Sequence, residues 1–142
     1  MSVKNIVQEI LDNTLLQHGV LSHHLRHVKT DAIQGLDVKI NDNEYVVYRS
    51  VSNGNGVYGD GRKEIGRKYV DVNYYYKYEK DDTRYSEVER RVEDIKKAFL
   101  ASKRFLLKND ASDIYDIDNP YRGINVEFLF VEAVNSEQHI NS

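Results

Sequence analysis

The chain has 142 residues and a formal net charge of −3 at pH 7, with 20 basic and 23 acidic side chains. This length fits one domain with its own core, and the balanced charge argues against a dedicated nucleic-acid binder. The chain has no cysteine, which excludes disulfides and thiol chemistry. The N-terminal segment lacks the apolar run of a signal peptide, and no segment approaches the roughly 20 apolar residues of a membrane helix. The sequence therefore predicts a soluble cytosolic protein.

The N-terminal part of the chain predicts one helix. Over residues 2–18, apolar side chains recur at three- and four-residue spacing, which is typical of an amphipathic helix. Ser2 is placed to cap its N-terminus, and Gly19 is placed to end it. Residues 22–32 fit either a short helical turn or a loop, and the sequence leaves both open.

Two strands are predicted next, at residues 37–40 and 44–51. The Asn-Asp-Asn run between them is typical of a turn, because these residues tolerate unusual backbone angles. The second strand has apolar residues on both of its sides. We therefore expect it inside the sheet, away from the edges.

The longest predicted strand covers residues 67–79, where apolar and polar side chains alternate with a period of two. Its even-numbered positions, including Val72, Tyr74 and Tyr76, are predicted to face the core, whereas Tyr75 lies on the polar side. Residues 52–66 precede this strand and hold five of the eight glycines of the chain. They predict a long, flexible hairpin loop.

The C-terminal half predicts a second helix over residues 86–102. Ser86 and Glu89 have the spacing of a capping box, with Ser86 as the N-cap, and an apolar stripe follows at helical spacing. The exposed side of this helix mixes acidic and basic residues that can pair. Three further segments are predicted: a short strand at 105–108, a polar loop at 109–121 and a last strand at 124–134.

Together, these elements predict an α+β domain over residues 1–134. We expect a mainly antiparallel sheet, with the N-terminal helix and the second long helix packed on one face. Residues 135–142 are predicted to be a polar C-terminal tail. The sequence shows no internal repeat and no domain boundary.

Several motifs suggest chemistry, but none has the context that the chemistry needs. Gly54 to Gly59 match G-x-G-x-x-G, yet a strand follows where a dinucleotide site needs a helix. Gly56 to Gly61 have the glycine spacing of a phosphate loop, but the Lys and Ser/Thr of that motif do not follow. We interpret the glycines as belonging to a mobile loop, and we expect no catalytic residue and no cofactor.

Two clusters could suggest a metal ion. His23, His24 and His27 lack a further ligand at a convincing spacing for zinc. The acidic run with Asp113, Asp116 and Asp118 lacks the Gly turn and terminal Glu of a calcium loop. Both are interpreted as solvated polar segments, and no metal site is expected.

An interface with another protein is the function that these residues favour. Tyrosine offers a large contact area with a polar tip, which suits interfaces, and the loop adds a small basic cluster beside it. The residues predicted to contact a neighbouring subunit or another partner protein are Tyr58, Asp60, Arg62, Lys63, Ile65, Arg67 and Tyr75.

The order of the predicted elements and the residue patterns within them resemble those of the tail terminator proteins of long-tailed bacteriophages. These are also called tail-completion or tail-to-head joining proteins. The resemblance is spread over most of the chain. It is carried by the N-terminal helix at 3–16, Y-V-V-Y at 45–48, the Gly/Asp-rich loop ending in a basic residue, K-Y-V-D-V-N-Y-Y-Y at 68–76, V-E-R-R-V-E-D-I at 88–95, and D-x-D-N-P-Y-R at 116–122 leading into 124–130.

This resemblance implies a structural virion protein and not an enzyme. Members of the family form hexameric rings that stop polymerisation of the tail tube and join the tail to the head connector. It further implies that DNA passes through the ring without specific binding, that no membrane is involved, and that the protein is found in the host cytoplasm during assembly and later in the virion.

Three alternatives remain open from the sequence. One is a head-completion or other connector protein of the virion neck. Another is a small nucleic-acid-binding α+β module that uses Arg62, Lys63, Arg67, Lys68 and nearby tyrosines. The last is an enzyme whose glycine loop grips a phosphate.

Overall fold

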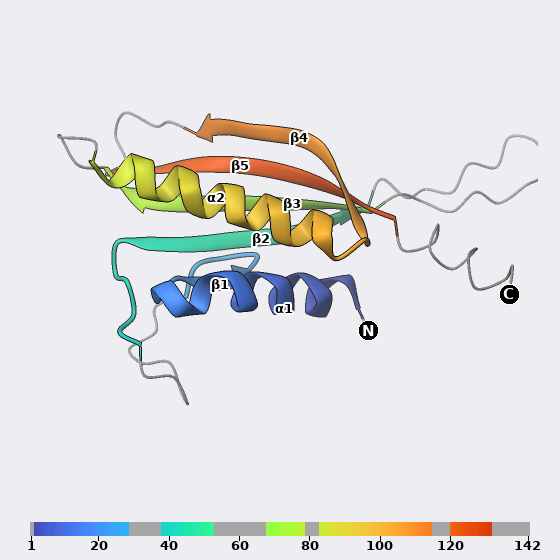
Figure 1. Ribbon diagram of the computed structural model, residues 1–142, viewed down its shortest axis with the longest axis horizontal. Coiled ribbons are helices and arrows are strands. Elements are labelled where there is room, and N and C mark those ends of the chain that lie inside the picture. The colour runs from blue at the N-terminus through green and yellow to red at the C-terminus, as the bar shows by residue number, and fades with distance from the viewer. Residues whose placement is uncertain (1, 29–37, 53–67, 79–82, 115–119, 132–142) are drawn as a thin grey trace, which may run out of the picture.

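The computed structural model describes residues 2–28, 38–52, 68–78, 83–114 and 120–131. They form an α+β domain with one five-stranded sheet, as the sequence predicts (Figure 1). The strands lie in the order β1-β2-β3-β5-β4, and every neighbouring pair is antiparallel except β1 and β2, which are parallel. In chain order the elements are α1 (Val3–Leu15), the 3-10 helix η1 (Leu16–His18), β1 (Leu21–His24), β2 (Glu44–Ser52), β3 (Lys68–Lys77), α2 (Thr83–Ala101), β4 (Phe105–Ile114) and β5 (Tyr121–Phe130).

Both helices pack on the same face of the sheet, and the core lies between the helices and the strands (Figure 1). The central strand β3 contributes Val70, Val72, Tyr74 and Tyr76 to this core, and all four are buried. The face assignment that follows from their period of two is confirmed. The opposite face of the sheet carries the odd-numbered side chains of β2, β3 and β5, most of which are half-buried.

The helical segment made of α1 and η1 begins and ends where the sequence predicts, although its last three residues form a 3-10 helix. The Ser2 hydroxyl accepts a hydrogen bond from the Asn5 backbone N–H at 3.1 Å, which caps the N-terminus. Gly19 ends the helical segment with a φ of 73°. A Cβ at this position would lie 2.1 Å from the Lys39 carbonyl oxygen, so both the backbone angle and the close packing require glycine.

The segment after α1 differs from the expectation. Residues 21–24 form the short parallel strand β1, where the sequence leaves a helical turn or a loop open for residues 22–32. Of the strand expected at 37–40, residues 38–40 are described and are not in a strand. The Asn41 N–H donates to the Gly19 carbonyl at 2.9 Å, so this segment packs against the end of α1 and does not extend the sheet.

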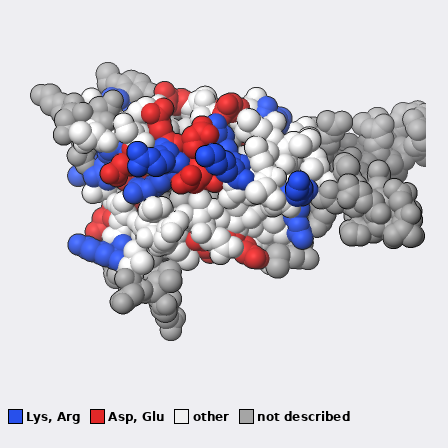
Figure 2. Space-filling model, viewed as in Figure 1, with Lys and Arg blue, Asp and Glu red and all other residues white. Residues whose placement is uncertain are grey.

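Helix α2 begins at Thr83, three residues earlier than predicted. Ser86 therefore lies inside the helix, and its prediction as the N-cap of a capping box is wrong. Tertiary contacts hold the earlier turn, because Arg84 pairs with Glu44 on β2 and Tyr85 packs 6.0 Å from the ring of Tyr76. The predicted apolar stripe is buried, and acidic and basic side chains intermingle along the helix (Figure 2).

Strand β4 runs from Phe105 to Ile114 and so takes up residues 109–114 of the loop predicted for 109–121. It is an edge strand whose register against β5 shifts between Leu107 and Asn109 and again between Asn109 and Ser112. Side chains on both of its sides are exposed, so the apolar alternation of a strand is absent from its sequence. Strand β5 begins at Tyr121, three residues before the predicted start, and ends at Phe130. The tail predicted for 135–142 lies outside the described residues.

Candidate functional site

Only one of the seven predicted interface residues, Tyr75, belongs to the part of the chain that the structure describes. The glycine motifs of the predicted loop and the acidic residues Asp116 and Asp118 also lie outside the described residues. Asp113 is described; it lies in β4 and accepts a hydrogen bond from the Tyr85 hydroxyl at 3.4 Å. The predicted interface residues outside the description are Tyr58, Asp60, Arg62, Lys63, Ile65 and Arg67.

Tyr75 lies on the sheet face opposite the helices, in a group of aromatic rings centred on Tyr45. In the strand register it stands between Tyr45 on β2 and Gly123 on β5. Its ring is 5.2 Å from that of Tyr45, which is in turn 5.6 Å from that of Tyr121. A Cβ on Gly123 would lie 3.0 Å from the Tyr75 ring, so the ring rests directly on the glycine. Tyr45, Tyr75 and Tyr121 are called the tyrosine cluster below.

A polar network fills the middle of the same face. The Asn125 side-chain amide donates to Asn73 at 2.7 Å and also to the Asp71 carboxylate. Asp71 pairs with Arg49 at 3.4 Å. The Asp71 carboxylate thus has both a hydrogen-bond donor and a cationic partner. The side chains of this network hold one another in fixed positions on the face.

A second pair of charges lies toward β4. The Lys108 ammonium is 3.8 Å from the Glu127 carboxylate and 4.6 Å from the centre of the Tyr69 ring. Because the carboxylates of this face have cationic partners, its net field is weak. Half-buried tyrosines with matched charges give this face the composition of a protein interface.

A pocket opens at the end of the sheet, where β1 and the starts of β2 and β5 meet. Its volume is about 580 Å³, within the range of small-ligand sites. The ring of His27 stacks on that of Tyr45 at 4.0 Å, and the ring of His23 meets His27 edge-on at 5.1 Å. The described residues that line it are Leu21, His23, His27, Val28, Ile40, Asn41, Asp42, Glu44, Tyr45 and Tyr121.

The three histidines do not act as one group. His23 and His27 line the pocket, whereas His24 lies beside Tyr48 with a ring distance of 5.3 Å. Burial lowers the pKa of His23, and the nearby His27 lowers it further. Burial and the nearby Lys4 lower the pKa of His24. Among the described residues, no three His, Cys, Asp or Glu side chains are grouped so that they could hold a metal ion.

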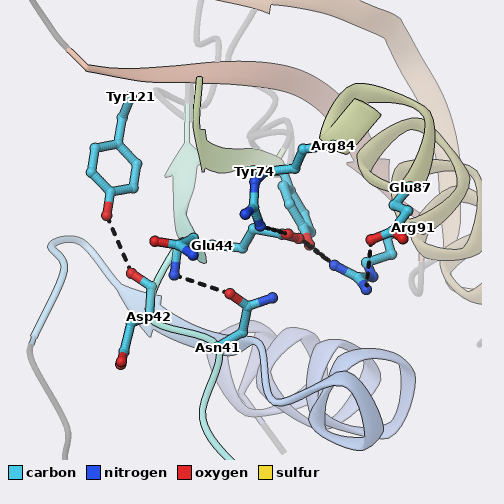
Figure 3. A network of polar contacts seen from close by, with 9 residues as sticks. Asn41, Asp42, Glu44, Tyr74, Arg84, Glu87, Arg91 and Tyr121 are labelled. Carbon is cyan, nitrogen blue, oxygen red and sulfur yellow. Dashed lines mark hydrogen bonds and ion pairs between the residues drawn. The ribbon is translucent and has the colours of Figure 1, made fainter. Parts of the chain in front are cut away.

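Next to the pocket, on the helix side of β2, lies the buried carboxylate of Glu44 (Figure 3). It accepts hydrogen bonds from the Tyr74 hydroxyl and from Arg91, and it pairs with Arg84 at 2.9 Å. Burial alone would raise the pKa of Glu44, but the Tyr74 hydroxyl and the two arginines outweigh it and hold the pKa below its usual value. Burial and the Glu44 carboxylate raise the pKa of Tyr74, which stays protonated.

The Glu44 network ties α2 to the start of β2, because Arg84 and Arg91 on the helix and Tyr74 on β3 all donate to this one carboxylate. Arg91 is held further by Glu87, one helical turn before it, at 3.7 Å. A carboxylate that is ionised and saturated in this way is poorly suited to accept or donate a proton in a reaction. We assign the network a structural role.

No protein-family model matches this chain, and a search of curated proteins found no match either. Among the described helices, none is long and apolar enough to cross a lipid bilayer. Within the described part of the chain, the candidate surfaces considered below are the sheet face with its tyrosine cluster, the pocket beside it and the exposed side of α2.

The sequence predicted Tyr75 but not its partners. Tyr45 and Tyr121 share a face with Tyr75, yet they belong to strands whose pairing cannot be read from local spacing. Glu44 could have been noticed, because it is the acidic member of an otherwise apolar inward series with Val46 and Tyr48. An acidic residue at an inward position implies a buried cationic partner.

Proposed function

We propose that this chain is a structural subunit that packs its tyrosine-rich sheet face against another protein subunit. The role is that of the tail terminator proteins, which its sequence resembles: a ring of subunits that caps the phage tail tube and joins the tail to the head connector. The ring would form in the host cytoplasm and remain in the virion.

The composition of the sheet face opposite the helices is the observation that supports this proposal. The tyrosine cluster is half-buried and pre-packed by cross-strand contacts of 5.2 and 5.6 Å, so little side-chain freedom is lost on docking. Tyrosine is enriched at interfaces, and unmatched charge is depleted from their centres. In the middle of this face, the Asp71 carboxylate is matched by Arg49 and by the Asn125 amide, so its charge is not left unmatched.

A ring needs two different patches on each subunit, because its contacts are head-to-tail. Helix α2 is the candidate for the second patch, since its exposed side chains include both acidic and basic residues (Figure 2). Pairs such as Lys96 with Glu93, at 2.6 Å, keep this surface soluble in the free subunit. The exposed member of such a pair, here Glu93, can turn to a neighbouring subunit at small cost, because ion pairs at the surface contribute little to stability.

The test compares two variants, one with a new positive charge on the sheet face and one with the same charge on another surface. Val47 is half-buried on this face, beside Asn73, and Val47→Lys would place a charge at the centre of the proposed contact. Asn13→Lys adds the same charge on the exposed side of α1 and is the matched control. The mass of each protein in solution is measured alone and with assembled tail tubes, after circular dichroism has shown that the fold is kept.

The parent and the Asn13 variant are expected to form multiples of the 16.5 kDa subunit or to bind tube ends, whereas the Val47 variant stays monomeric. If the Val47 variant assembles like the parent, the contact lies on another surface. A parent that remains monomeric and unbound in both conditions contradicts the proposed role.

Binding of single-stranded nucleic acid is the second candidate function. It is favoured by the ring of Tyr69 with Lys108 above it and by Arg49 on the same face, because bases stack on aromatic rings beside cations. It ranks second because both cations are already paired with carboxylates. Oligonucleotide binding that falls steeply as salt rises would favour it over the ring subunit.

A further inference from the structure

The side chains that line the pocket at the end of the sheet favour a positively charged ligand over a neutral or a negative one. The hydroxyl of Tyr121 donates to the Asp42 carbonyl at 3.2 Å and so joins β5 to the segment before β2 at one side of the pocket (Figure 3). The volume of about 580 Å³ leaves room for a small organic molecule or for the end of a long side chain.

Four rings contribute to the wall of this pocket. Those of Tyr45 and His27 stack at 4.0 Å, and His23 meets His27 edge-on at 5.1 Å, so these three rings are packed against one another in the wall. Tyr121 extends this group from Tyr45 at 5.6 Å. The face of an aromatic ring carries partial negative charge and attracts cations. Because burial lowers the pKa of His23, this imidazole is neutral near pH 7 and does not repel a cation.

The charged groups at the pocket are acidic. Asp42 and Glu44 line it, and none of its described lining residues is Lys or Arg. The Glu44 carboxylate is neutralised by Arg84 and Arg91 on the helix side of β2, so Asp42 is the group that supplies negative charge. Asp42 is exposed, and only its carbonyl is engaged by Tyr121 among the contacts described for it.

We propose that this pocket binds an organic cation of the size of a trimethylammonium group, held against the rings of Tyr45 and Tyr121 and balanced by Asp42. Anions are disfavoured by Asp42 and by the ring faces, and a divalent metal lacks the ligands that it needs. A neutral apolar molecule would fill the space but gain nothing from the charge. The same cation could be a free small molecule or an alkylated lysine side chain of a partner protein.

The experiment compares choline with 3,3-dimethylbutan-1-ol, which has nearly the same shape and no charge. Chemical shifts of the full-length protein are followed by NMR during titration with each compound, with sodium chloride as the ionic-strength control. Choline is expected to shift the resonances of the pocket residues and to bind at least about tenfold more tightly than the alcohol, the ratio that one cation–π contact supplies. Equal binding of the two compounds, or no shift with choline up to tens of millimolar, would overturn the proposal.

Two substitutions of Tyr121 distinguish the contribution of its ring from that of its hydrogen bond to Asp42. Tyr121→Phe keeps the ring and loses the bond to Asp42, so it should retain choline binding, whereas Tyr121→Leu should weaken it about tenfold. Asp42→Asn removes only the charge of an exposed residue and should also weaken binding. Tyr69→Leu, on the same sheet face but outside the pocket lining, is the control and should leave binding unchanged. If Tyr121→Leu does not fold, Asp42→Asn still decides the outcome, because unchanged choline binding in that variant contradicts a charge-selective pocket.

A further arm identifies the source of the cation. A short peptide containing trimethyllysine is titrated beside free choline and beside the same peptide with unmodified lysine. Tighter binding of the trimethyllysine peptide assigns the pocket to a partner protein, and tighter binding of choline assigns it to a small molecule. This result is independent of ring assembly, which is measured by the mass of the Val47 variant.

Discussion

The Arg84 guanidinium lies 2.9 Å from the buried carboxylate of Glu44, and this pair joins the first turn of α2 to the first residue of β2. The two residues are 40 positions apart in the chain. The contact explains why α2 begins before its predicted cap, since the helix must already be formed at Arg84 to reach Glu44. It also fixes how the helix lies along the sheet, so its removal should lower the stability of the whole domain.

Replacement of Glu44 should be costly. Glu44→Gln keeps the size of the side chain but leaves Arg84 and Arg91 without their anionic partner. Removing one member of a buried ion pair lowers the free energy of unfolding by about 3 kcal/mol. Chemical denaturation measures this change, and Glu93→Gln, at an exposed position of α2, should change stability by less than about 0.5 kcal/mol. Equal effects of the two substitutions would mean that the network does not stabilise the fold.

The same carboxylate makes the stability depend on pH. The pKa of Glu44 is lowered in the folded protein, so its contribution is fully present above the usual glutamate pKa and is lost as the pH falls through the folded value. Burial raises the pKa of Asp12, and this outweighs its bond to Gln8, so Asp12 acts in the opposite direction. The difference in melting temperature between the parent and Glu44→Gln isolates the Glu44 term. This difference should be constant from pH 8 to about pH 5 and shrink in stronger acid; a difference that grows in acid would contradict the assigned sign.

A charge on the core face of the central strands should prevent folding. Val72 and Phe128 are almost completely buried between the sheet and the helices. We expect Val72→Asp or Phe128→Asp to abolish soluble folded protein, because an unpaired buried charge is severely unfavourable. Val51→Asp, at an exposed position on the opposite face of β2, is the control and should fold. Solubility and the unfolding transition give the readout, and a normal transition in either core variant would refute the packing described for it.

The glycine-rich loop should contribute to assembly and not to the fold. Strands β2 and β3 pair continuously from Glu44 opposite Tyr76 to Ser52 opposite Lys68, so the hairpin is complete without residues 54–61. Replacing these residues with a short turn should preserve circular dichroism and the melting temperature. The variant should fail to cap tails or to join them to heads, because it lacks Tyr58, our predicted aromatic contact with the partner, and displaces the predicted contacts Arg62 and Lys63 that follow. An unfolded variant would make the loop part of the core, and an active one would make it a passive linker.

Elements with strong local periodicity were predictable from the sequence, and those defined by distant partners were not. The alternation in β3 gives the buried face correctly, and the cap at Ser2 gives the start of α1. Strand β1 has only four residues, too few to show a period, and depends on pairing with β2. Strand β4 is polar because both of its sides are exposed, so its sequence resembles that of a loop.

The candidate site also combines a residue that local periodicity predicts with residues that only distant strand pairing brings together. Tyr75 was predicted from its position on the polar side of β3. The pocket depends on residues from β1, β2 and β5 that meet only in the folded sheet, and its Tyr121 was assigned to a loop. The stacking of His27 on Tyr45 has no signature in the sequence, because the two residues are brought together only by the pairing of β1 with β2.

The order of the strands has a consequence for synthesis on the ribosome. Strand β5 comes last in the chain but lies between β3 and β4. While the ribosome is still adding residues before Tyr121, the inner edge of β3 and the whole of β4 lack the strand that joins them. Nascent chains therefore expose unpaired backbone on the central strand of the sheet, and such edges recruit other chains. We expect truncated products that end before β5 to aggregate, and we expect the cell to protect this protein until the residues up to Phe130 have left the exit tunnel.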